Sequence, residues 1–312
     1  MTRYKIMKNM EKRGPGPLFR FRLRYGGTYM PLQDFSRAEA AALLPGRPAD
    51  MHKGDRGRLL VVGGSDRYPG APALSALAAL RSGSGVVSLL SSPAVCAACA
   101  ARIPEVVHLP EAGDWARTAL NEAPSLAAAV LGPGLGRSAE SLNVVQELWV
   151  RWPKPLLVDG DGLFALSGVA VEACPPRDDA VLTPHEGEAA RLLGISSDAV
   201  RGDRPSAARR LAERWGCVLL KGNPTIVAWR GEEAARRLSW GGPELSVPGS
   251  GDVLSGCIGA LLAMGLAAQD AALLGASLHG MAGARLRSGG VDGVLASEIA
   301  DALRPAIEAL RS

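Results

Sequence analysis

The fold class follows from residues 58–92, RLLVVGGSDRYPGAPALSALAALRSGSGVVSLLSS, where apolar runs flank a helix-forming segment. Residues 58–64 and 85–92 are rich in valine and leucine and bordered by glycine, which is typical of buried strands. Residues 71–83 between them are rich in alanine and end at a glycine, which predicts a helix. Two buried strands joined by a helix predict a crossover connection and therefore a parallel sheet.

The same alternation continues to the C-terminus. Further strands are predicted at residues 128–131, 155–162, 180–188 and 217–225, and a hairpin that turns at Arg230–Gly231 follows them. Further helices are predicted at residues 94–102, 139–152, 205–215, 253–264, 270–286 and 296–310. This order predicts an α/β fold, a three-layer α/β/α sandwich with a mainly parallel central sheet. We expect residues 30–312 to form one domain.

The positive charge is concentrated at the N-terminus. The chain has a formal net charge of +4, but residues 1–29 carry eight basic residues and a single acidic one, so the remainder is mildly acidic. A mildly acidic body does not favour nucleic-acid binding. Residues 1–29 lack the apolar region of a secretory signal. We interpret them as a disordered extension or a start codon assigned too early, with Met30 as the natural beginning.

The cysteines and the apolar runs indicate the compartment. Five cysteines are an odd number in a chain of 312 residues, so no disulfide framework is expected and a cytoplasmic location is predicted. Cys96 and Cys99 form a CxxC within an alanine-rich segment and are interpreted as small buried hydrophobes, not as a redox pair. No apolar run reaches the ~18 residues of a membrane span, so no membrane association is expected.

Glycines and polar residues gather where the predicted strands end. The five segments concerned are Gly-Gly-Ser at 63–65, Gly-Pro-Gly at 132–134, Asp-Gly-Asp at 159–161, Thr-Pro-His-Glu at 183–186 and Lys-Gly-Asn at 221–223. The carboxyl ends of parallel strands meet at one edge of a sheet, and ligands of open α/β sheets bind beyond that edge. The sequence therefore predicts a ligand site there.

Several common sites are absent from the sequence. There is no GxxxxGK[ST] phosphate loop, no GxGxxG after the first strand, no GxSxG elbow and no HExxH pair. No residue is assigned as a metal ligand.

The segment GSGD at 249–252 indicates the chemistry. Its glycines let backbone N–H groups approach a ligand, and the helix that follows offers unpaired N–H groups to an anion such as a phosphate. The helix dipole is expected to hold Asp252 ionised. A carboxylate beside a phosphate site can accept a proton from an attacking hydroxyl, as in a small-molecule kinase. The alternative is that Asp252 only caps the helix.

Six segments in a fixed order resemble one family. They lie at residues 52–87, 131–136 (LGPGLG), 158–163 (VDGDGL), 182–194 (LTPHEGEAARLLG), 219–228 (LLKGNPTIVA) and 249–266 (GSGDVLSGCIGALLAMGL). The set resembles the ADP/ATP-dependent NAD(P)H-hydrate dehydratases of the ribokinase-like superfamily, from about residue 51 to the C-terminus. The resemblance implies a ribokinase-like sandwich. It also implies repair of the (S) epimer of NADH or NADPH hydrate, with ADP or ATP and Mg²⁺, through a phosphorylated intermediate.

The resemblance also implies roles for individual residues. Asp252 would be the base, and Gly251 would contact the nucleotide. The AMP portion would be held by Lys221, Gly222, Asn223, Pro224 and Thr225. The hydrate would be bound by Ala71, Gly134, His185 and Asp252. A homo-oligomer, a tetramer by resemblance, and a separate epimerase are expected.

Residues 240–252, WGGPELSVPGSGD, depart from the family, in which this loop commonly reads TGNPGMATGGTGD. Gly242 replaces the asparagine, Glu244 adds a charge, and Pro248 removes one N–H donor.

Lys221 has two possible roles. It would either form an ion pair with Asp159 or Asp161, or contact a nucleotide phosphate. We expect the phosphate contact, and we therefore expect that replacing Lys221 changes the stability of the protein little.

Two other functions remain open: a kinase of a vitamin precursor, of the pyrimidine or thiazole type, and a non-catalytic nucleotide-binding protein.

Overall fold

The computed structural model describes residues 31–48, 50–170 and 173–312. Within these residues, ten strands form one sheet. The strands are β1 (Leu32–Asp34), β2 (Arg58–Val62), β3 (Val86–Ser91), β4 (Val107–Pro110), β5 (Ala128–Leu131), β6 (Leu156–Val158), β7 (Arg177–Leu182), β8 (Gly216–Leu220), β9 (Thr225–Trp229) and β10 (Ala235–Leu238). Their order is β1-β10-β9-β8-β7-β6-β5-β2-β3-β4. Every neighbouring pair is parallel except β9 with β8 and with β10.

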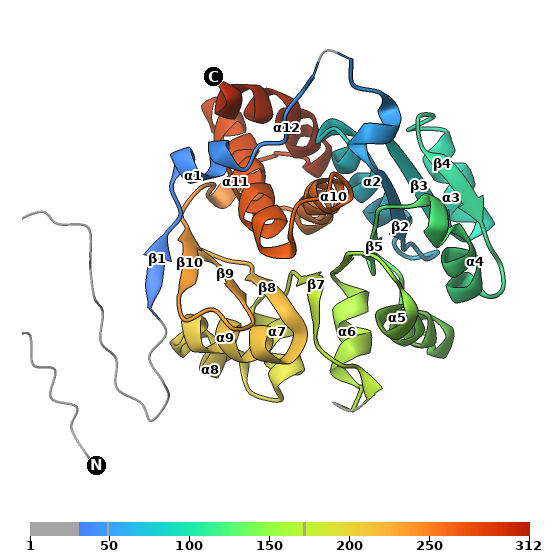
Figure 1. Ribbon diagram of the computed structural model, residues 1–312, viewed down its shortest axis with the longest axis horizontal. Coiled ribbons are helices and arrows are strands. Elements are labelled where there is room, and N and C mark those ends of the chain that lie inside the picture. Colours follow the sequence, from blue (N-terminus) through green and yellow to red (C-terminus); the bar gives the residue numbers. More distant parts are fainter. Residues whose placement is uncertain (1–30, 49, 171–172) are drawn as a thin grey trace, which may run out of the picture.

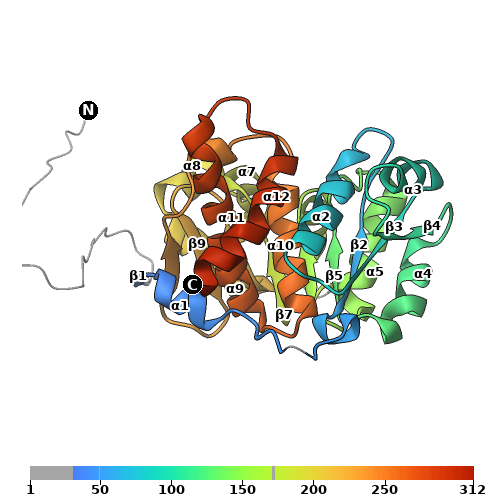
Figure 2. The same cartoon turned by 90° about the horizontal axis from the view of Figure 1, so that it is seen from above.

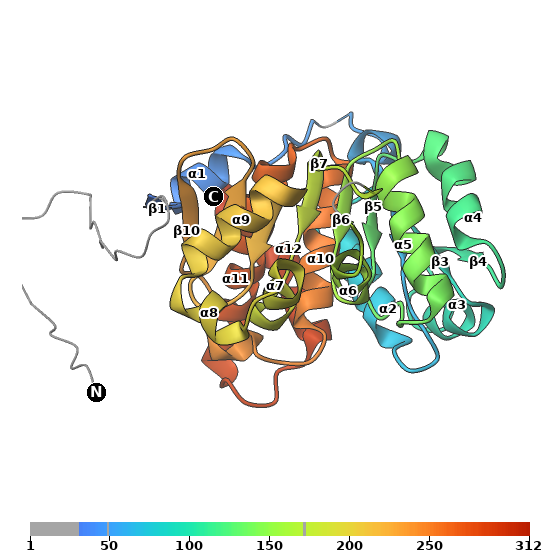
Figure 3. The same ribbon diagram turned by 90° about the horizontal axis from the view of Figure 1, so that it is seen from below.

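Helices cover both faces of the sheet (Figure 1). One face carries α1 (Arg37–Ala42), α2 (Gly70–Arg81), α10 (Ser250–Ala263), α11 (Ala268–Leu286) and α12 (Ala296–Arg311), which lie in front in Figure 2. The other face carries α4 (Trp115–Glu122), α5 (Ala139–Arg151), α6 (Asp161–Ser167), α7 (Glu186–Leu193), α8 (Ser197–Gly202) and α9 (Arg204–Trp215), seen in Figure 3. Helix α3 (Pro93–Ala100) follows β3 at one end. No described helix has the length and apolar character needed to span a bilayer.

The strand side chains alternate between two cores. In β2, Leu59 and Val61 pack with α2 and α10, whereas Leu60 and Val62 pack on the opposite face with α5. All four side chains are fully buried. A strand buried on both faces must be apolar at every position, which is why the sequence shows continuous apolar runs. The predicted three-layer sandwich with a mainly parallel sheet is confirmed.

Three predicted strands were too long. The strand predicted at 155–162 ends at Val158, because Gly160, at a φ of 55°, turns the chain into α6. The strand predicted at 180–188 ends at Leu182, because His185 caps α7. The strand predicted at 217–225 ends at Leu220, and a turn leads from it to β9, which begins at Thr225. Apolar periodicity shows where a buried strand lies but not where the following turn begins.

Several short elements were not predicted from the sequence, and one prediction falls on residues that the structure does not describe. The hairpin at Arg230–Gly231 is confirmed, since β9 and β10 pair antiparallel on either side of it. The short elements β1, α1, β4, α4, α6, α7 and α8 had no prediction. The predicted basic extension, residues 1–29, lies outside the described residues.

The CxxC cysteines lie on α3. Cys96 and Cys99 are both free and buried, and burial raises the pKa of Cys99 to about 11. A thiol with a raised pKa is a poor nucleophile. Their interpretation as small buried hydrophobes is confirmed.

The close packing of α10 against α2 depends on Gly256. A Cβ at this position would lie 2.0 Å from the carbonyl oxygen of Ser75, a backbone atom of α2. We expect Gly256→Ala to lower the free energy of unfolding by ~1–3 kcal/mol, the usual cost of overpacking. Denaturant unfolding measures it. The control is Gly202→Ala in α8, where no atom lies within 4 Å and no loss is expected. Equal stability of the two variants would contradict the packing argument.

Candidate active site

The carboxyl ends of β2, β5, β6, β7 and β8 meet at one edge of the sheet, as predicted. The loops that follow them are joined by backbone hydrogen bonds: the N–H of Gly64 donates to Pro133 O (2.9 Å), and the N–H of Lys221 donates to Pro184 O (2.8 Å). The first turn of α10 lies over this edge, since a Cβ on Gly251 would lie 3.4 Å from Lys221 Nζ. The edge therefore brings together segments from five strands and one helix N-terminus.

Asp252 lies in this first turn, mostly buried. Its pKa is raised to about 7, first by burial and then by the negative charge of Asp159, and these outweigh the positive charge of Lys221. The expectation that the helix dipole keeps Asp252 ionised is therefore wrong, because the dipole contributes only ~0.3–1 kcal/mol. A carboxyl group with a pKa near 7 is well matched to general base catalysis at neutral pH.

Lys221 occupies a buried cluster of charges. Its Nζ lies 2.8 Å from Asp159 Oδ1 and 3.7 Å from Glu188 Oε2. The second oxygen of Asp159 accepts a hydrogen bond of 2.7 Å from Ser255 Oγ. Burial raises the pKa of Asp159, but Lys221 and the hydrogen bonds outweigh it and hold the pKa below its ordinary value. Burial likewise raises the pKa of Glu188, and there Lys221 does not fully compensate.

The cluster corrects the expectation for Lys221. Lys221 pairs with Asp159, the first of its two possible roles, so we now expect its loss to lower stability. Phosphate contact by the same ammonium stays a prediction.

The turn at residues 221–225 is braced by Arg204, which the sequence reasoning missed. Arg204 Nη2 donates to the carbonyls of Lys221 (3.1 Å) and Pro224 (3.0 Å). Gly222 has a φ of 142°, and a Cβ there would lie 2.6 Å from Arg204 Nη2. Within the turn, Thr225 Oγ1 donates to Gly222 O (3.0 Å). No motif marks Arg204, because it acts from α9 on a loop after β8.

Two of the predicted hydrate-binding residues lie in contact. A Cβ on Gly134, whose φ is 59°, would lie 2.9 Å from the Cβ of Ala71 and 2.7 Å from the carbonyl oxygen of Tyr68. Ser75 connects this part of the edge to the base, because its hydroxyl donates to the carbonyl oxygens of Asp252 (2.9 Å) and Ala71 (3.3 Å). Asp252 therefore lies between the Ala71–Gly134 contact and the Lys221 cluster. Tyr68, whose side chain is about half exposed, also lies beside Gly134, and no sequence motif predicted its place in the site.

His185 is the N-cap of α7. Its Nδ1 accepts the N–H groups of Gly187 (3.0 Å) and Glu188 (3.4 Å), so the neutral ring carries its proton on Nε2. The side chain is 60% exposed, so His185 is capped but not buried. Its Nε2 lies 3.6 Å from Glu188 Oε1, and a contact of this nitrogen with the hydrate stays a prediction.

The charge added in the loop at residues 240–252 is neutralised by Arg287, which lies outside the loop. Glu244 is completely buried, and its carboxylate pairs with Arg287 at 2.8 and 3.1 Å. A Cβ on Gly242 would lie 2.5 Å from Arg287 Nη2, so glycine leaves room for this pair. The added charge and the glycine therefore act together.

Residues 59–305 match the family model described as NAD(P)H-hydrate dehydratase. The chain belongs to the NAD(P)H-hydrate dehydratase family. The resemblance drawn from the six segments is thereby confirmed.

Two curated relatives illustrate the family. The bifunctional NAD(P)H-hydrate repair enzyme Nnr of Thermanaerovibrio acidaminovorans is 43% identical over 263 residues, which cover 80% of this chain and 50% of that protein. The Escherichia coli enzyme of the same name is 37% identical over 282 residues, which cover 88% and 52%. The chain therefore spans about half the length of the curated relatives it matches.

Solved structures of relatives show the fold of the family. The Bacillus subtilis ADP/ATP-dependent NAD(P)H-hydrate dehydratase, co-crystallized with ATP/Mg²⁺, has a TM-score of 0.78 at 27% identity and covers 91% of this chain and 100% of its own. A ribokinase-like superfamily protein of Enterococcus faecalis has a TM-score of 0.79 at 22% identity, with 93% and 100% covered. The predicted ribokinase-like sandwich of this NAD(P)H-hydrate dehydratase family member is confirmed.

Proposed function

We propose that this chain dehydrates the (S) epimer of NADH or NADPH hydrate with ADP or ATP as phosphoryl donor. The observation that carries the proposal is the position of Asp252. Its backbone is joined through the Ser75 hydroxyl to Ala71, and its carboxyl group, with a pKa raised to about 7, feels the charges of Asp159 and Lys221. The family and the nucleotide complex of the Bacillus subtilis relative support the choice of substrates.

Asp252 would act as the general base. It accepts the proton of the hydroxyl at C6 of the nicotinamide ring while that oxygen forms a bond to the terminal phosphorus of the nucleotide. The bond from this phosphorus to the nucleotide leaving group breaks, so AMP leaves from ADP, or ADP from ATP. In the second step the C6–O bond breaks and phosphate departs. Loss of a proton from C5 then forms the C5=C6 double bond of NADH or NADPH.

The rest of the edge would hold the nucleotide. The N–H of Ser250, the first residue of α10, donates to Val247 O (3.2 Å), so the N–H groups of Gly251 and Asp252 would be the ones that bind the phosphates. The turn at residues 221–225, held by Arg204, would take the AMP portion. Lys221 would approach a phosphate from its pair with Asp159. His185 would contact the hydrate through Nε2.

The site suits a Mg²⁺ that arrives with the nucleotide. Mg²⁺ usually keeps several waters and binds through one or two carboxylates plus substrate phosphates. The described residues contain no group of three or more His, Cys, Asp or Glu side chains able to hold a metal ion. Glu188, whose pKa stays raised by burial despite the charge of Lys221, is the carboxylate that would help to hold it. When bound, Mg²⁺ neutralises charge that develops on the transferring phosphoryl group.

The test is incubation of the protein with NADH hydrate and either ADP or ATP, with recovery of the absorbance of reduced nicotinamide as readout. We expect recovery that depends on the nucleotide and releases one phosphate per hydrate repaired. A vitamin-precursor kinase would instead phosphorylate a thiazole or pyrimidine alcohol and leave the hydrate unchanged. A non-catalytic binding protein would do neither.

The pKa of Asp252 predicts the pH dependence of the reaction. A base must be deprotonated, so kcat/KM should rise with pH up to about 7 and then level off, with a tenfold fall for each pH unit below that value. The pH profile of hydrate repair measures it. A base with the ordinary carboxyl pKa of 3.8 would instead give a flat profile from pH 5 upward, which would contradict the raised pKa of Asp252.

Four further expectations stay predictions. They are a cytoplasmic location, a homo-oligomeric (tetrameric) assembly, a separate epimerase that supplies the (S) epimer, and one domain over residues 30–312.

A further inference from the structure

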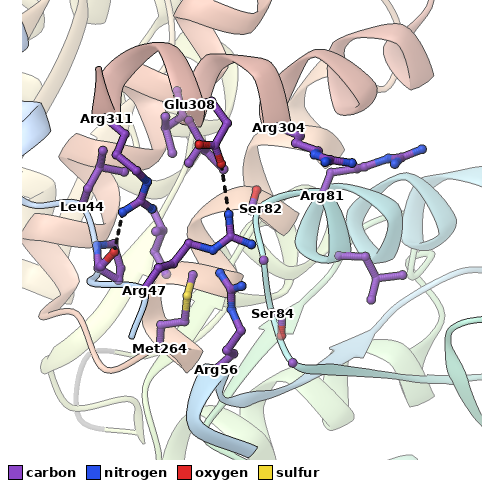
Figure 4. A pocket seen from close by; sticks show the side chains of 17 residues that line it. Leu44, Arg47, Arg56, Arg81, Ser82, Ser84, Met264, Arg304, Glu308 and Arg311 are labelled. Atoms are coloured by element: carbon purple, nitrogen blue, oxygen red, sulfur yellow. Dashed lines mark hydrogen bonds and ion pairs between the residues drawn. The ribbon is translucent and has the colours of Figure 1, made fainter. Parts of the chain in front are cut away.

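A polar cavity lies at the edge of the sheet opposite Asp252. It is found where Arg56 precedes β2, residues 82–85 precede β3, and α2, α10 and α12 end (Figure 4). Its volume of about 410 Å³ lies within the range of small-molecule sites. The charged residues that line it are Arg47, Arg56, Arg81, Arg304, Arg311 and Glu308.

The positive charge of this cavity is not balanced. Arg47 pairs with Glu308 (3.0 Å), and Arg81 pairs with Asp301 (2.8 Å). The guanidinium groups of Arg56, Arg304 and Arg311 have no ion-pair partner within the described parts of the chain. Three arginines therefore contribute uncompensated charge around one cavity.

Arg56 is the most constrained of them. A Cβ on Gly83 would lie 2.4 Å from Arg56 Nη2, so its guanidinium is held against the backbone of the loop before β3. Its Nε is buried without a hydrogen-bond partner. Burial lowers the pKa of Arg56, and the like charges of Arg47 and Arg311 lower it further. Figure 4 shows Arg47 and Arg56 directed into the same space.

Helix ends account for only part of this cluster. Arg81 and Arg311 lie in the last turns of α2 and α12, where the partial negative charge of the helix terminus favours a cation. Arg56 lies in the short helix η1 (Lys53–Arg56) before β2, and Arg304 lies within α12. Arg56 ends a helix of only four residues, and Arg304 lies away from the ends of α12, so helix termini do not account for their convergence.

We propose that this cavity binds a small molecule that carries phosphate groups, at a site separate from the Asp252 edge. The planar guanidinium group matches phosphate oxygens in a bidentate geometry, and a bound anion would relieve the repulsion between neighbouring arginines. Leu80, Met264 and Ile307 supply an apolar wall for the remainder of the ligand. The basic residues 1–29 have the wrong charge to occupy it.

The test is calorimetric titration with pyrophosphate, with inorganic phosphate and ADP as further probes that distinguish the number of phosphates recognised. We expect Arg56→Gln and Arg304→Gln each to weaken one pyrophosphate-binding component by about tenfold or more, the loss of one charge-assisted hydrogen bond. Lys221→Met should keep this component. The matched control is Arg151→Gln on α5, an exposed arginine paired with Glu147, which should bind like the wild type.

Hydrate repair provides an independent readout, because Arg56, Arg304 and Arg311 line a cavity at the opposite edge of the sheet from Asp252. Repair by Arg56→Gln and Arg304→Gln should stay at the wild-type level, whatever the outcome of the titration. Arg304 is exposed, so its variant should fold even if Arg56→Gln does not. Identical pyrophosphate titrations for wild type and Arg304→Gln, or no binding component beyond the one lost in Lys221→Met, would overturn the proposal.

Discussion

Asp252→Asn is expected to lower the turnover of NADH hydrate by about 10²–10⁴-fold, the usual contribution of a general base. Asparagine has nearly the same shape but cannot accept the proton of the C6 hydroxyl. The first turn of α10 and the Ser75 hydrogen bond to the backbone of residue 252 do not depend on the carboxylate. Nucleotide binding should therefore persist. The measurement is repair rate beside calorimetric nucleotide affinity, and near-normal turnover would exclude Asp252 as the base.

The stability of the same variant provides its control. The pKa of Asp252 rises from an ordinary 3.8 to about 7 on folding, so the unfolded state loses its proton first as pH rises. The stabilisation from the protonated carboxyl is present in acid and is lost as the pH rises toward 7. Asparagine stays neutral throughout. At pH 8 Asp252→Asn should be at least as stable as the wild type, and a large loss of stability there would attribute the lost turnover to unfolding.

Lys221→Met is expected to destabilise the fold by ~3–5 kcal/mol, the cost of leaving one partner of a buried ion pair uncompensated. The variant removes the only cation that the structure places within ion-pair distance of Asp159 among the described residues. Asp159 is almost fully buried, with 4% of its side chain exposed. Nucleotide affinity should also fall, by ~1.5–3 kcal/mol, if the ammonium contacts a phosphate. Denaturant unfolding without nucleotide and calorimetry with ADP measure the two effects separately.

Two further variants distinguish a buried pair from a general effect of charge removal. In the double variant Lys221→Met/Asp159→Asn, stability should recover much of the loss, because no charge is left unpaired. Arg230→Met breaks an exposed pair with Asp178 and should cost ~0–1 kcal/mol. A double variant as unstable as Lys221→Met alone would show that the pair does not account for the loss.

The sequence by itself determined the fold class, the edge that holds the site and the family. These properties depend on patterns that are local in the chain. Continuous apolar runs such as residues 58–62 mark strands buried on both faces, and glycine and polar segments mark the strand ends. The segments at 131–136, 158–163, 182–194 and 249–266 keep their order in the sequence, and α/β topology then brings them to one edge.

Only the tertiary structure decided how the charges at that edge interact. Lys221 and Asp159 are 62 residues apart in the sequence, which offered both Asp159 and Asp161 as partners and did not decide between them. Arg204 braces the 221–225 turn from a different element, and the pKa of Asp252 is set by burial, which is a property of the whole packed edge. A local rule, the helix dipole, predicted an ionised Asp252 and was wrong, because desolvation and neighbouring charges act through space and exceed it.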